Sequence, residues 1–318
     1  MKCLCCGKPI ADTSSSEEKK SQWHHGCVRS FFGTDRMPAL DLSEDKLEEL
    51  AGRTIRRGLT VPGVQKKLSL HLSDDKARLT IVDYPAGYIL KPQTAEYEEL
   101  PQQEHLAMSL AETAGIQTVP HALIKIRDQY AYITKRIDRE IKEEGTRLYA
   151  MEDFCQLAGR LTQDKYKSSY EYCGKIIKRY SSFPQDDLSK LFLRVVFSYV
   201  IGNSDMHLKN FSLRERQPAK REFCLSEAYD ILPVNVVLAE DKEQFALTLN
   251  GKKRNVRKKD FLILAQSLEI LEKDAEDRIS KLCMLKDKFE KQCEEACLSQ
   301  SWRERVRELI GVRIRSIT

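Results

Sequence analysis

A polar loop in the second half of the chain gathers side chains that could do chemistry. Residues 202–211 read GNSDMHLKNF and contain Asp205 and, five positions later, Asn210. An aspartate can accept the proton of an attacking hydroxyl while an asparagine oxygen holds Mg²⁺, as phosphoryl transfer requires. Further along, Asp230 follows a strand-like piece and could bind the Mg²⁺ ions that bridge nucleotide phosphates. The pattern favours kinase-type chemistry over the alternative, a solvated loop beside an unrelated acid.

The first half of the chain contains groups that could hold the phosphates of a nucleotide. Lys91 ends the apolar segment 87–90, where its ammonium could neutralise the α- and β-phosphates, and Glu104 could pair with it. The segment 58–67 (GLTVPGVQKK) could direct backbone N–H groups toward phosphates, although it matches neither standard phosphate-binding fingerprint. Taken singly, these features are equally typical of a surface lysine, a first-turn acid and an ordinary turn. Their order along the chain favours a nucleotide clamp.

The hydrophobic spacing predicts the elements that must position these groups. Before residue 140 it predicts helices at 41–58 and 101–114 and strands at 64–72, 77–84, 87–91, 121–126 and 129–137. From residue 151 it predicts helices at 151–160, 169–180, 187–201, 259–267, 272–296 and 302–309, with strand-like pieces near 223 and 245–249. We therefore expect a bilobal α+β fold, with a small β-rich lobe followed by a larger helical lobe. Ligands usually bind in the cleft between such lobes.

Four cysteines and two histidines lie in the first 36 residues. Cys3-x₂-Cys6 and His24-x₂-Cys27, separated by seventeen residues, have the spacing of a Cys₃His zinc site. So short a segment could hardly bury a core of its own, so a metal would supply its folding energy. The alternatives are His25 in place of His24, Cys5 in place of one of the other cysteines, or unliganded thiols.

Length, charge and hydropathy exclude several classes of protein. A chain of 318 residues exceeds the usual size of one hydrophobic core, which also favours two lobes. The chain has 53 Lys and Arg against 48 Asp and Glu. The resulting net charge of +5 is too small for a protein that binds nucleic acid mainly through its overall electrostatic field. The basic run 252–259 and the arginines of the last helix are best interpreted as solvated, because no aromatic residues or groove-reading motif accompany them. No segment has the apolar length of a membrane span, and residues 1–10 lack a signal-peptide core, so we expect a cytoplasmic protein with no membrane partner.

From about Met37 onward, the order of the motifs resembles the HipA-type serine/threonine kinase toxins. The matching segments are TVPGVQKKLSL (60–70), YILKP (88–92), EHLAMSLAETAGIQTVP (104–120), TKRIDR (134–139), MEDFCQLAG (151–159), GNSDMHLKNF (202–211) and AYDILPV (228–234). The resemblance implies a two-lobed, kinase-like fold that transfers the γ-phosphate of ATP, with Mg²⁺, to Ser or Thr of a protein target. Residues 1–36 stand apart by composition as a Cys/His head, so three domains are expected, namely this head, an N-lobe at 37–150 and a helical C-lobe at 151–318.

The resemblance also implies roles for individual residues. Asp205 matches the family's catalytic base, Asn210 and Asp230 match its Mg²⁺ ligands, and Lys91 matches its phosphate-binding lysine. Glu104 remains the expected partner of Lys91 from their order in the chain. The other residues that the resemblance assigns to the nucleotide site are Pro62, Gly63, Val64, Gln65, Lys66 and Lys67 of the phosphate loop, Glu152, Asp153 and Phe154 of the adenine-contacting hinge, and His207, Lys209 and Tyr229.

Thr60 occupies the position at which family members autophosphorylate, and a phosphate there would eject or refold the phosphate loop and so block ATP. The alternative is an ordinary β-branched turn residue. The segment before Thr60 is short for this family, and this shortness resembles the HipT type. That type implies two antitoxin partners, a small protein similar to the missing N-terminal subdomain and a DNA-binding protein, so that DNA would be contacted only indirectly. A translation component such as an aminoacyl-tRNA synthetase is one plausible target. Two alternatives stay open, a small-molecule or lipid kinase on the same fold and a nucleotide-binding co-repressor without transfer activity.

Overall fold

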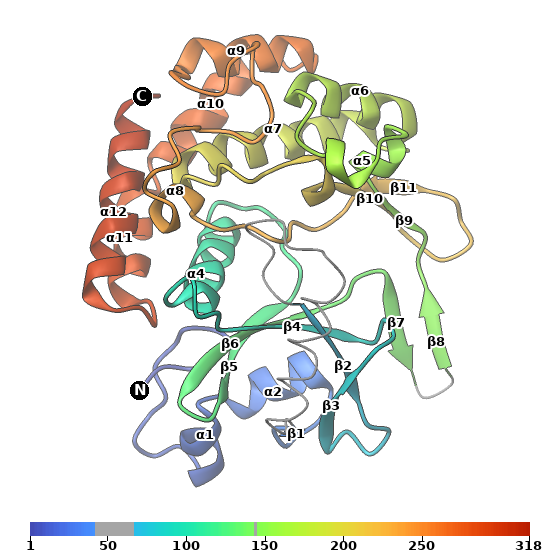
Figure 1. Cartoon of the computed structure of the whole chain (residues 1–318), viewed down its shortest axis with the longest axis vertical. Coiled ribbons are helices and arrows are strands. Elements are labelled where there is room, and N and C mark those ends of the chain that lie inside the picture. The colour runs from blue at the N-terminus through green and yellow to red at the C-terminus, as the bar shows by residue number, and fades with distance from the viewer. Residues whose placement is uncertain (42–66, 143–144) are drawn as a thin grey trace. The chain divides into compact units, whose positions relative to one another are not determined.

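The computed structural model of the chain describes residues 1–41, 67–142 and 145–318 (Figure 1). The chain divides into two compact units. The first comprises Met1–His105 and Pro120–Thr146, and the second comprises Leu106–Val119 and Arg147–Thr318. Helix α4 (Leu100–Thr113) runs across this division.

A six-stranded sheet forms the centre of the first unit. In spatial order its strands are β1 (Ala39–Asp41), β3 (Arg78–Val82), β2 (Leu68–Leu72), β4 (Tyr88–Pro92), β6 (Gln129–Lys135) and β5 (His121–Ile126). Neighbouring strands are antiparallel, except that β1 and β3 are parallel. In β3, Leu79 and Ile81 are buried and the residues on either side are not, as the alternation of side chains along a half-buried strand requires. β4, which carries Lys91, lies between β2 and β6.

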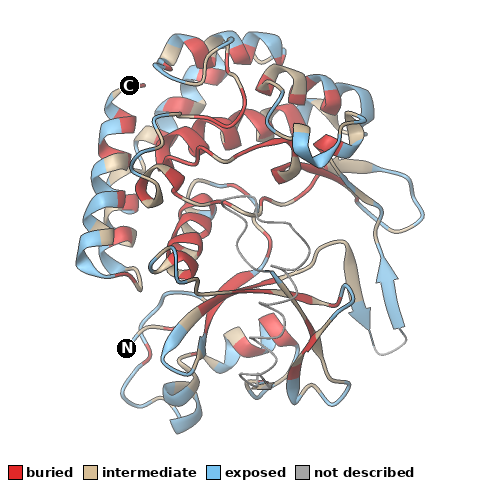
Figure 2. Ribbon diagram, viewed as in Figure 1, coloured by how far each residue is buried: buried red, intermediate tan, exposed pale blue. Residues whose placement is uncertain are grey.

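The N-terminal residues share a hydrophobic core with this sheet. They form α1 (Ser16–Ser21) and α2 (His25–Phe32), and α2 places buried residues against the sheet (Figure 2). The rings of Phe31 and Phe32 lie 5.9 and 5.5 Å from the ring of Tyr88 on β4, measured between centroids, and both also contact Trp23. Trp23 is completely buried. These large aromatic rings bury apolar surface between the N-terminal segment and the sheet.

Helix α7 (Pro184–Ile201) forms the centre of the second unit. The first turn of α7 contains Pro184 and two aspartates, all of which favour a helix start. Gly202 ends the helix in the left-handed conformation, which glycine adopts without strain. Residues of α7 contact α6 (Tyr170–Tyr180), α9 (Lys258–Ser267), α10 (Glu272–Cys283) and α12 (Gln300–Arg315). These neighbours bury most of the helix from Leu191 onward. A helix that is buried on all sides needs apolar residues on every face, which accounts for the nearly continuous apolar run LFLRVVFSYVI.

The remaining elements of the second unit are short. β11 (Phe223–Leu225), β10 (Ser212–Glu215) and β9 (Met151–Asp153) form an antiparallel sheet in that order. The others are α5 (Phe154–Leu157), η1 (Thr162–Asp164), η2 (Leu208–Asn210), α8 (Val234–Val237) and α11 (Lys286–Glu295). β7 (Arg139–Lys142) and β8 (Gly145–Leu148) form a separate two-stranded sheet. Within the described ranges, no helix combines the length and the apolar character that crossing a membrane requires.

The predicted α+β fold class is confirmed, and three local predictions are wrong. The helix expected at 151–160 begins as strand β9, because residues 151–153 pair with β10, and only α5 is helical. The helix expected at 272–296 is two helices, α10 and α11, although neither Gly nor Pro marks the break in the sequence. The strand-like piece at 245–249 makes only isolated bridges, at Thr248 and Leu249. The helix expected at 41–58 lies outside the described residues, apart from Asp41, which ends β1.

Candidate functional site

The loop that carries Asp205 begins at the end of α7. Gly202 adopts φ +71° and its N–H donates to the carbonyl oxygens of Ser198 and Tyr199. A Cβ at this position would collide with Leu309 and lie 3.3 Å from the Cβ of Asn235. Glycine is therefore required both for the backbone conformation and for the close approach of α12 and α8. The N–H of Asn203 then donates to the carbonyl of Ser198 over 2.8 Å, which turns the chain back across the helix end.

Asp205 is held at its backbone and at one carboxylate oxygen. Its N–H donates to Asn203 Oδ1 over 3.2 Å, and its Oδ1 accepts a hydrogen bond of 2.7 Å from the hydroxyl of Tyr166. Its Oδ2 lies 4.0 Å from His207 Nε2. The side chain is 45% exposed. The carboxylate is thus positioned to accept a hydroxyl hydrogen bond while it remains accessible to a substrate.

Asn210 is bonded directly to the Asp205 segment. Its Nδ2 donates to the carbonyl oxygen of Asp205 over 3.0 Å, and its side chain is buried. This hydrogen bond fixes the amide, so that Oδ1 remains as the acceptor atom available to a ligand. The carbonyl-type oxygen of an asparagine side chain is a ligand that Mg²⁺ and Ca²⁺ accept.

His207 is buried in the same loop, with its Nε2 4.0 Å from Asp205 Oδ2. Burial lowers the pKa of its imidazole, while the nearby carboxylates of Asp205 and Asp230 act in the opposite direction. Within the described part of the chain, its buried Nδ1 has no hydrogen-bond partner. A neutral imidazole whose second ring nitrogen makes no hydrogen bond to the described residues could form that bond with a bound ligand.

Asp230 follows a segment that is tied to several other parts of the second unit. Ala228 exchanges hydrogen bonds with the 117–119 segment, through its carbonyl to Val119 N–H and through its N–H to Gln117 O. The hydroxyl of Tyr229 lies 2.5 Å from the hydroxyl of Ser212 and 3.2 Å from the carbonyl oxygen of Lys209. Burial raises the pKa of the Tyr229 phenol. Tyr229 therefore links the Asp230 segment to the loop that carries Asp205.

The backbone of Asp230 adopts φ +59°, a conformation that non-glycine residues seldom take. Aspartate is one of the few side chains other than glycine that take this conformation readily, because its short polar group can bond to the local backbone.

The residues predicted as the hinge differ in exposure. Glu152 is exposed on β9, while Asp153 caps α5 and its Oδ2 lies 2.6 Å from Lys209 Nζ. Phe154 is completely buried, its ring stacks on Phe211, and its N–H donates to the Phe211 carbonyl. Asp153 and Phe154 thereby position the 209–211 end of the loop, and only Glu152 presents its side chain to solvent.

In the first unit, Lys91 and Glu104 form a buried ion pair. Lys91 Nζ lies 2.5 Å from Glu104 Oε1, and the two side chains are 5% and 2% exposed. Lys91 also lies 5.3 Å from the centre of the Tyr132 ring. Lys67 is exposed immediately before β2, whereas Thr60 and Pro62, Gly63, Val64, Gln65 and Lys66 lie outside the described residues.

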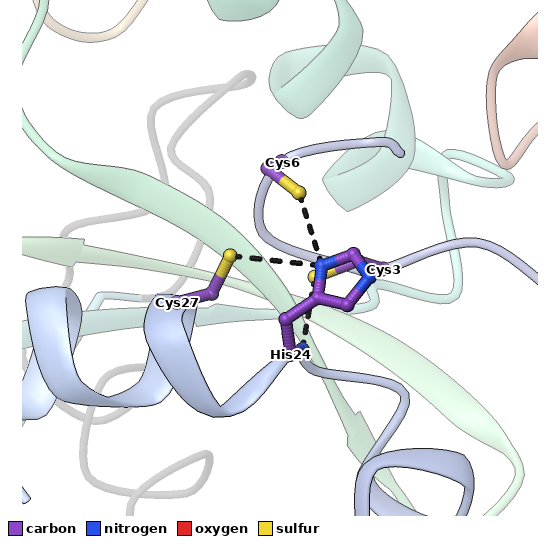
Figure 3. Close-up of side chains that lie close together, drawn as sticks. All are labelled: Cys3, Cys6, His24 and Cys27. Atoms are coloured by element: carbon purple, nitrogen blue, oxygen red, sulfur yellow. Dashed lines mark hydrogen bonds between the residues drawn. The ribbon is translucent and has the colours of Figure 1, made fainter. Parts of the chain in front are cut away.

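The structure also brings together Cys3, Cys6, His24 and Cys27, whose ligand atoms all lie within 4.8 Å of one another (Figure 3). Residues from the N-terminal loop and from the first turn of α2 thus converge on one point. Within the described ranges, no other group of three or more His, Cys, Asp or Glu side chains comes close enough to hold a metal.

The sequence did not point to Tyr166, and it assigned no role to Asn203 although that residue lies in the motif GNSDMHLKNF. Tyr166 is separated from Asp205 by 39 positions, and no spacing rule relates an aromatic residue to a catalytic loop at that distance. The segment around it is held near the loop by the N–H of Leu208, which donates to the carbonyl of Lys165 over 3.2 Å. The only signal in the sequence was a tyrosine between two lysines in a polar stretch.

Three residues of the second unit carry the kind of oxygen donor that Mg²⁺ prefers. Hard oxygen donors are present on Asp205, Asn210 and Asp230, and Asn210 keeps Oδ1 available. Nδ1 of the buried His207, which has no hydrogen-bond partner among the residues that the structure describes, is a further polar group that a ligand could use.

A model of the HipA-like C-terminal domain family matches residues 59–289. The chain belongs to this family. The family resemblance predicted from the motifs is thereby confirmed.

Three curated relatives carry the name kinase. "Putative kinase Y4mE" of Sinorhizobium fredii is 32% identical over 170 residues, which are 52% of this chain and 40% of that protein. "Putative kinase Y4dM" of the same species is 31% identical over 232 residues, 67% of this chain and 54% of that protein. A "Putative kinase" of Haemophilus influenzae is 25% identical over 189 residues, 57% of this chain and 54% of that protein. The chain spans about half the length of these relatives. Their names support the interpretation of this chain as a kinase.

Two solved structures show the fold. HipA of Shewanella oneidensis, solved with HipB and operator DNA, superposes with a TM-score of 0.71 at 16% identity and covers 81% of this chain and 65% of that one. The Helicobacter pylori proinflammatory kinase CtkA superposes with a TM-score of 0.53 at 15% identity and covers 75% of this chain and 90% of that one. The kinase-like fold is therefore shown by two structures of distant sequence.

Proposed function

We propose that this protein transfers the γ-phosphate of Mg²⁺·ATP to serine or threonine of a protein target. The observation that carries the proposal is the environment of Asp205. Its half-exposed carboxylate already accepts a hydrogen bond from a hydroxyl, and its carbonyl fixes Asn210 with Oδ1 available. That combination suits a base for an attacking hydroxyl beside an oxygen ligand for the metal.

In this mechanism, each residue has a separate task. Asp205 accepts the proton of the substrate hydroxyl at its carboxylate. Asn210 and Asp230 would hold Mg²⁺, and that ion would neutralise charge on the phosphates. His207, kept neutral by burial, adds no charge and leaves Nδ1 for the ligand. Lys91, oriented by Glu104, contacts the phosphates.

The same proposal covers the residues that the family motifs assign to nucleotide binding. Pro62–Lys67 would cover the phosphates, Glu152 would lie beside the adenine with Asp153 and Phe154 as its support, and Lys209 and Tyr229 would hold the loop. Thr60 would be the regulatory autophosphorylation site. The support for these roles is the order of the family motifs, together with the contacts of Asp153, Lys209 and Tyr229 described above.

The proposal is tested by labelled phosphate transfer with an Asp230→Asn variant. Asn keeps the size of the side chain and removes its negative charge, so the affinity for Mg²⁺ and the rate of phosphate transfer should both fall. The rate should fall by at least about 100-fold, which is the usual effect of removing a group that stabilises charge in the transition state. Purified protein is incubated with γ-labelled ATP, Mg²⁺ and a bacterial lysate, and labelled proteins are analysed for phosphoserine and phosphothreonine. Phosphopeptide mapping of the kinase itself reports on Thr60.

Asp274→Asn, at an exposed position in the first turn of α10, is the matched control and should transfer like the wild type. Label confined to small molecules or lipids would favour a kinase for those substrates instead. Tight ATP binding by the wild type without any transfer would favour a nucleotide-binding co-repressor.

We also propose antitoxin partners for this chain, a small protein similar to an N-terminal subdomain and a DNA-binding protein. Support comes from the HipA structure, which was solved with HipB and operator DNA.

Replacement of Tyr166 by Phe should increase phosphorylation of the protein target. The Tyr166 hydroxyl occupies a lone pair of Asp205 that a substrate hydroxyl would use. Burial and the charge of Asp205 raise the pKa of the Tyr166 phenol, so the phenol stays protonated and keeps its hydrogen bond to Asp205. A half-exposed hydrogen bond to a carboxylate is worth about 1 kcal/mol, so KM for the acceptor should fall about threefold to tenfold with kcat nearly unchanged.

Initial rates at varied acceptor concentration separate the two constants. Tyr180→Phe, on the surface of α6, is the control. A fall in kcat at constant KM would show that Tyr166 orients Asp205 rather than competing with the substrate.

A further inference from the structure

The Cys/His cluster has the dimensions of a tetrahedral zinc site. With Zn–S bonds of about 2.3 Å and Zn–N bonds of about 2.0 Å, ligand atoms of a tetrahedral ion lie roughly 3.5–3.8 Å apart. Here His24 Nδ1 lies 3.4 Å from Cys6 Sγ and 4.0 Å from Cys27 Sγ. The sulfur of Cys3 belongs to the same group, and Figure 3 shows the imidazole among the three thiols. Three thiols and one imidazole form a closed set of four, the composition of a structural rather than a catalytic zinc site.

Hydrogen bonds around His24 prepare one ring nitrogen for a metal. Its Nε2 lies 3.1 Å from the carbonyl oxygen of Pro9, which can only accept a hydrogen bond, so Nε2 carries the proton. Nδ1 then has its lone pair directed at the thiols. In metal sites, a carbonyl partner on the second nitrogen fixes the tautomer and the ring orientation of the ligand in this way. The N–H of His24 also donates to Cys3 Sγ over 3.4 Å, a contact that stabilises a thiolate.

The structure decides between the histidines and cysteines that the spacing left open. His25 points elsewhere, because its Nε2 lies 3.0 Å from Ser15 Oγ and its Nδ1 3.3 Å from the carbonyl of Asp35. Cys5 lies in the same loop but outside the group of four. His24 and Cys3, Cys6 and Cys27 are therefore the ligand set that the geometry favours.

The site joins two segments that both contact the sheet of the first unit. The loop of Cys3 is closed by hydrogen bonds from Cys3 N–H to Lys8 O and from Gly7 N–H to Cys3 O, each 2.9 Å long. Between the two loop cysteines, Leu4 accepts a hydrogen bond of 2.9 Å from the N–H of Leu123 on edge strand β5. Next to His24, the indole of Trp23 donates to the Leu123 carbonyl over 3.1 Å. One ion would thus hold together the two segments that cover the edge of β5.

We propose that Cys3, Cys6, His24 and Cys27 bind one structural Zn²⁺, which fastens the N-terminal loop to α2 and both to the sheet that carries Lys91. The ion takes no part in phosphotransfer. Its binding free energy stabilises the first unit, because an unfolded chain does not present the four ligands together.

Metal analysis and unfolding of the full-length protein test this proposal. The wild type, purified without added chelator, should contain one Zn²⁺ per chain. Replacement by Co²⁺ should produce the absorption bands of a tetrahedral ion with thiolate charge transfer. Removal of the metal should lower the melting temperature, and added Zn²⁺ should restore it. Absence of bound metal, or a melting temperature that does not respond to Zn²⁺, would overturn the proposal.

Matched variants separate ligands from neighbours. Cys6→Ser and His24→Gln should weaken Zn²⁺ affinity by more than about 100-fold, since loss of an outer hydrogen-bond partner alone costs 10–100-fold. Cys5→Ser and His25→Gln should keep the full zinc content. Cys6 is exposed, so its replacement by Ser leaves the apolar core intact, and competition with a zinc indicator measures affinity even if stability falls. Equal loss of zinc in Cys5→Ser would refute the assigned ligand set. A variant without phosphotransfer, such as Asp205→Asn, should retain its zinc, which keeps this test independent of the proposed activity.

Discussion

Asp205→Asn is expected to abolish phosphate transfer while leaving the protein folded. A positioned general base contributes about 10²–10⁴ to the rate, and an asparagine cannot accept the proton of the attacking hydroxyl. The substitution is conservative for the structure, because the amide oxygen can still accept the hydrogen bond from Tyr166 and the backbone bonds to Asn203 and Asn210 do not involve the side chain. Transfer of label from γ-labelled ATP, measured as initial rates at saturating Mg²⁺·ATP, checks this expectation.

Two measurements separate chemistry from folding in this variant. The melting temperature should remain near that of the wild type, since the Asp205 side chain is half exposed and its 2.7 Å hydrogen bond from Tyr166 is one that Asn preserves. Nucleotide affinity should change less than the rate. Asp274→Asn again serves as the surface control. If Asp205→Asn transferred phosphate at the wild-type rate, the assignment of Asp205 as the base would be wrong.

Breaking the Lys91–Glu104 pair should destabilise the protein and also remove its activity. Both side chains are buried, and removal of one partner from a buried ion pair leaves a charge without its main counter-charge, at about 3–5 kcal/mol. Lys91→Met and Glu104→Leu should each lower the free energy of unfolding by an amount of this order. Chemical denaturation followed by the fluorescence of the buried Trp23, in a background in which Trp302 of the second unit is replaced by Phe, measures the change.

The double variant Lys91→Met/Glu104→Leu distinguishes stability from function. Replacing a buried ion pair by apolar residues of similar volume is often neutral, so the double variant should recover most of the stability that each single variant loses. It should nevertheless fail to transfer phosphate, because no ammonium remains to contact the nucleotide. Lys281→Met is the control, since its pair with Asp277 has nearly the same length, 2.6 Å, but is exposed and should contribute less than about 1 kcal/mol. An active double variant would contradict the role of Lys91 in phosphate binding.

The elements whose formation depends on local patterning were predictable. Strands β5 and β6 and helix α7 follow the expected ranges closely, because alternation and continuous apolar character are properties of neighbouring residues. β9 was mistaken for the start of a helix, because its three residues are in a strand only through pairing with β10, about 60 positions away. No local pattern records such a partner.

The sequence by itself determined the family, through several motifs in a fixed order, and it determined which residue types were available for chemistry. Tertiary structure alone decided which of them meet. It selected His24 over His25 by giving His25 other partners, it buried the Lys91–Glu104 pair, and it placed the Tyr166 hydroxyl on Asp205. Hydrogen bonds and ion pairs depend on distances of a few ångströms between side chains, and those distances are set by the packing of elements far apart in the chain.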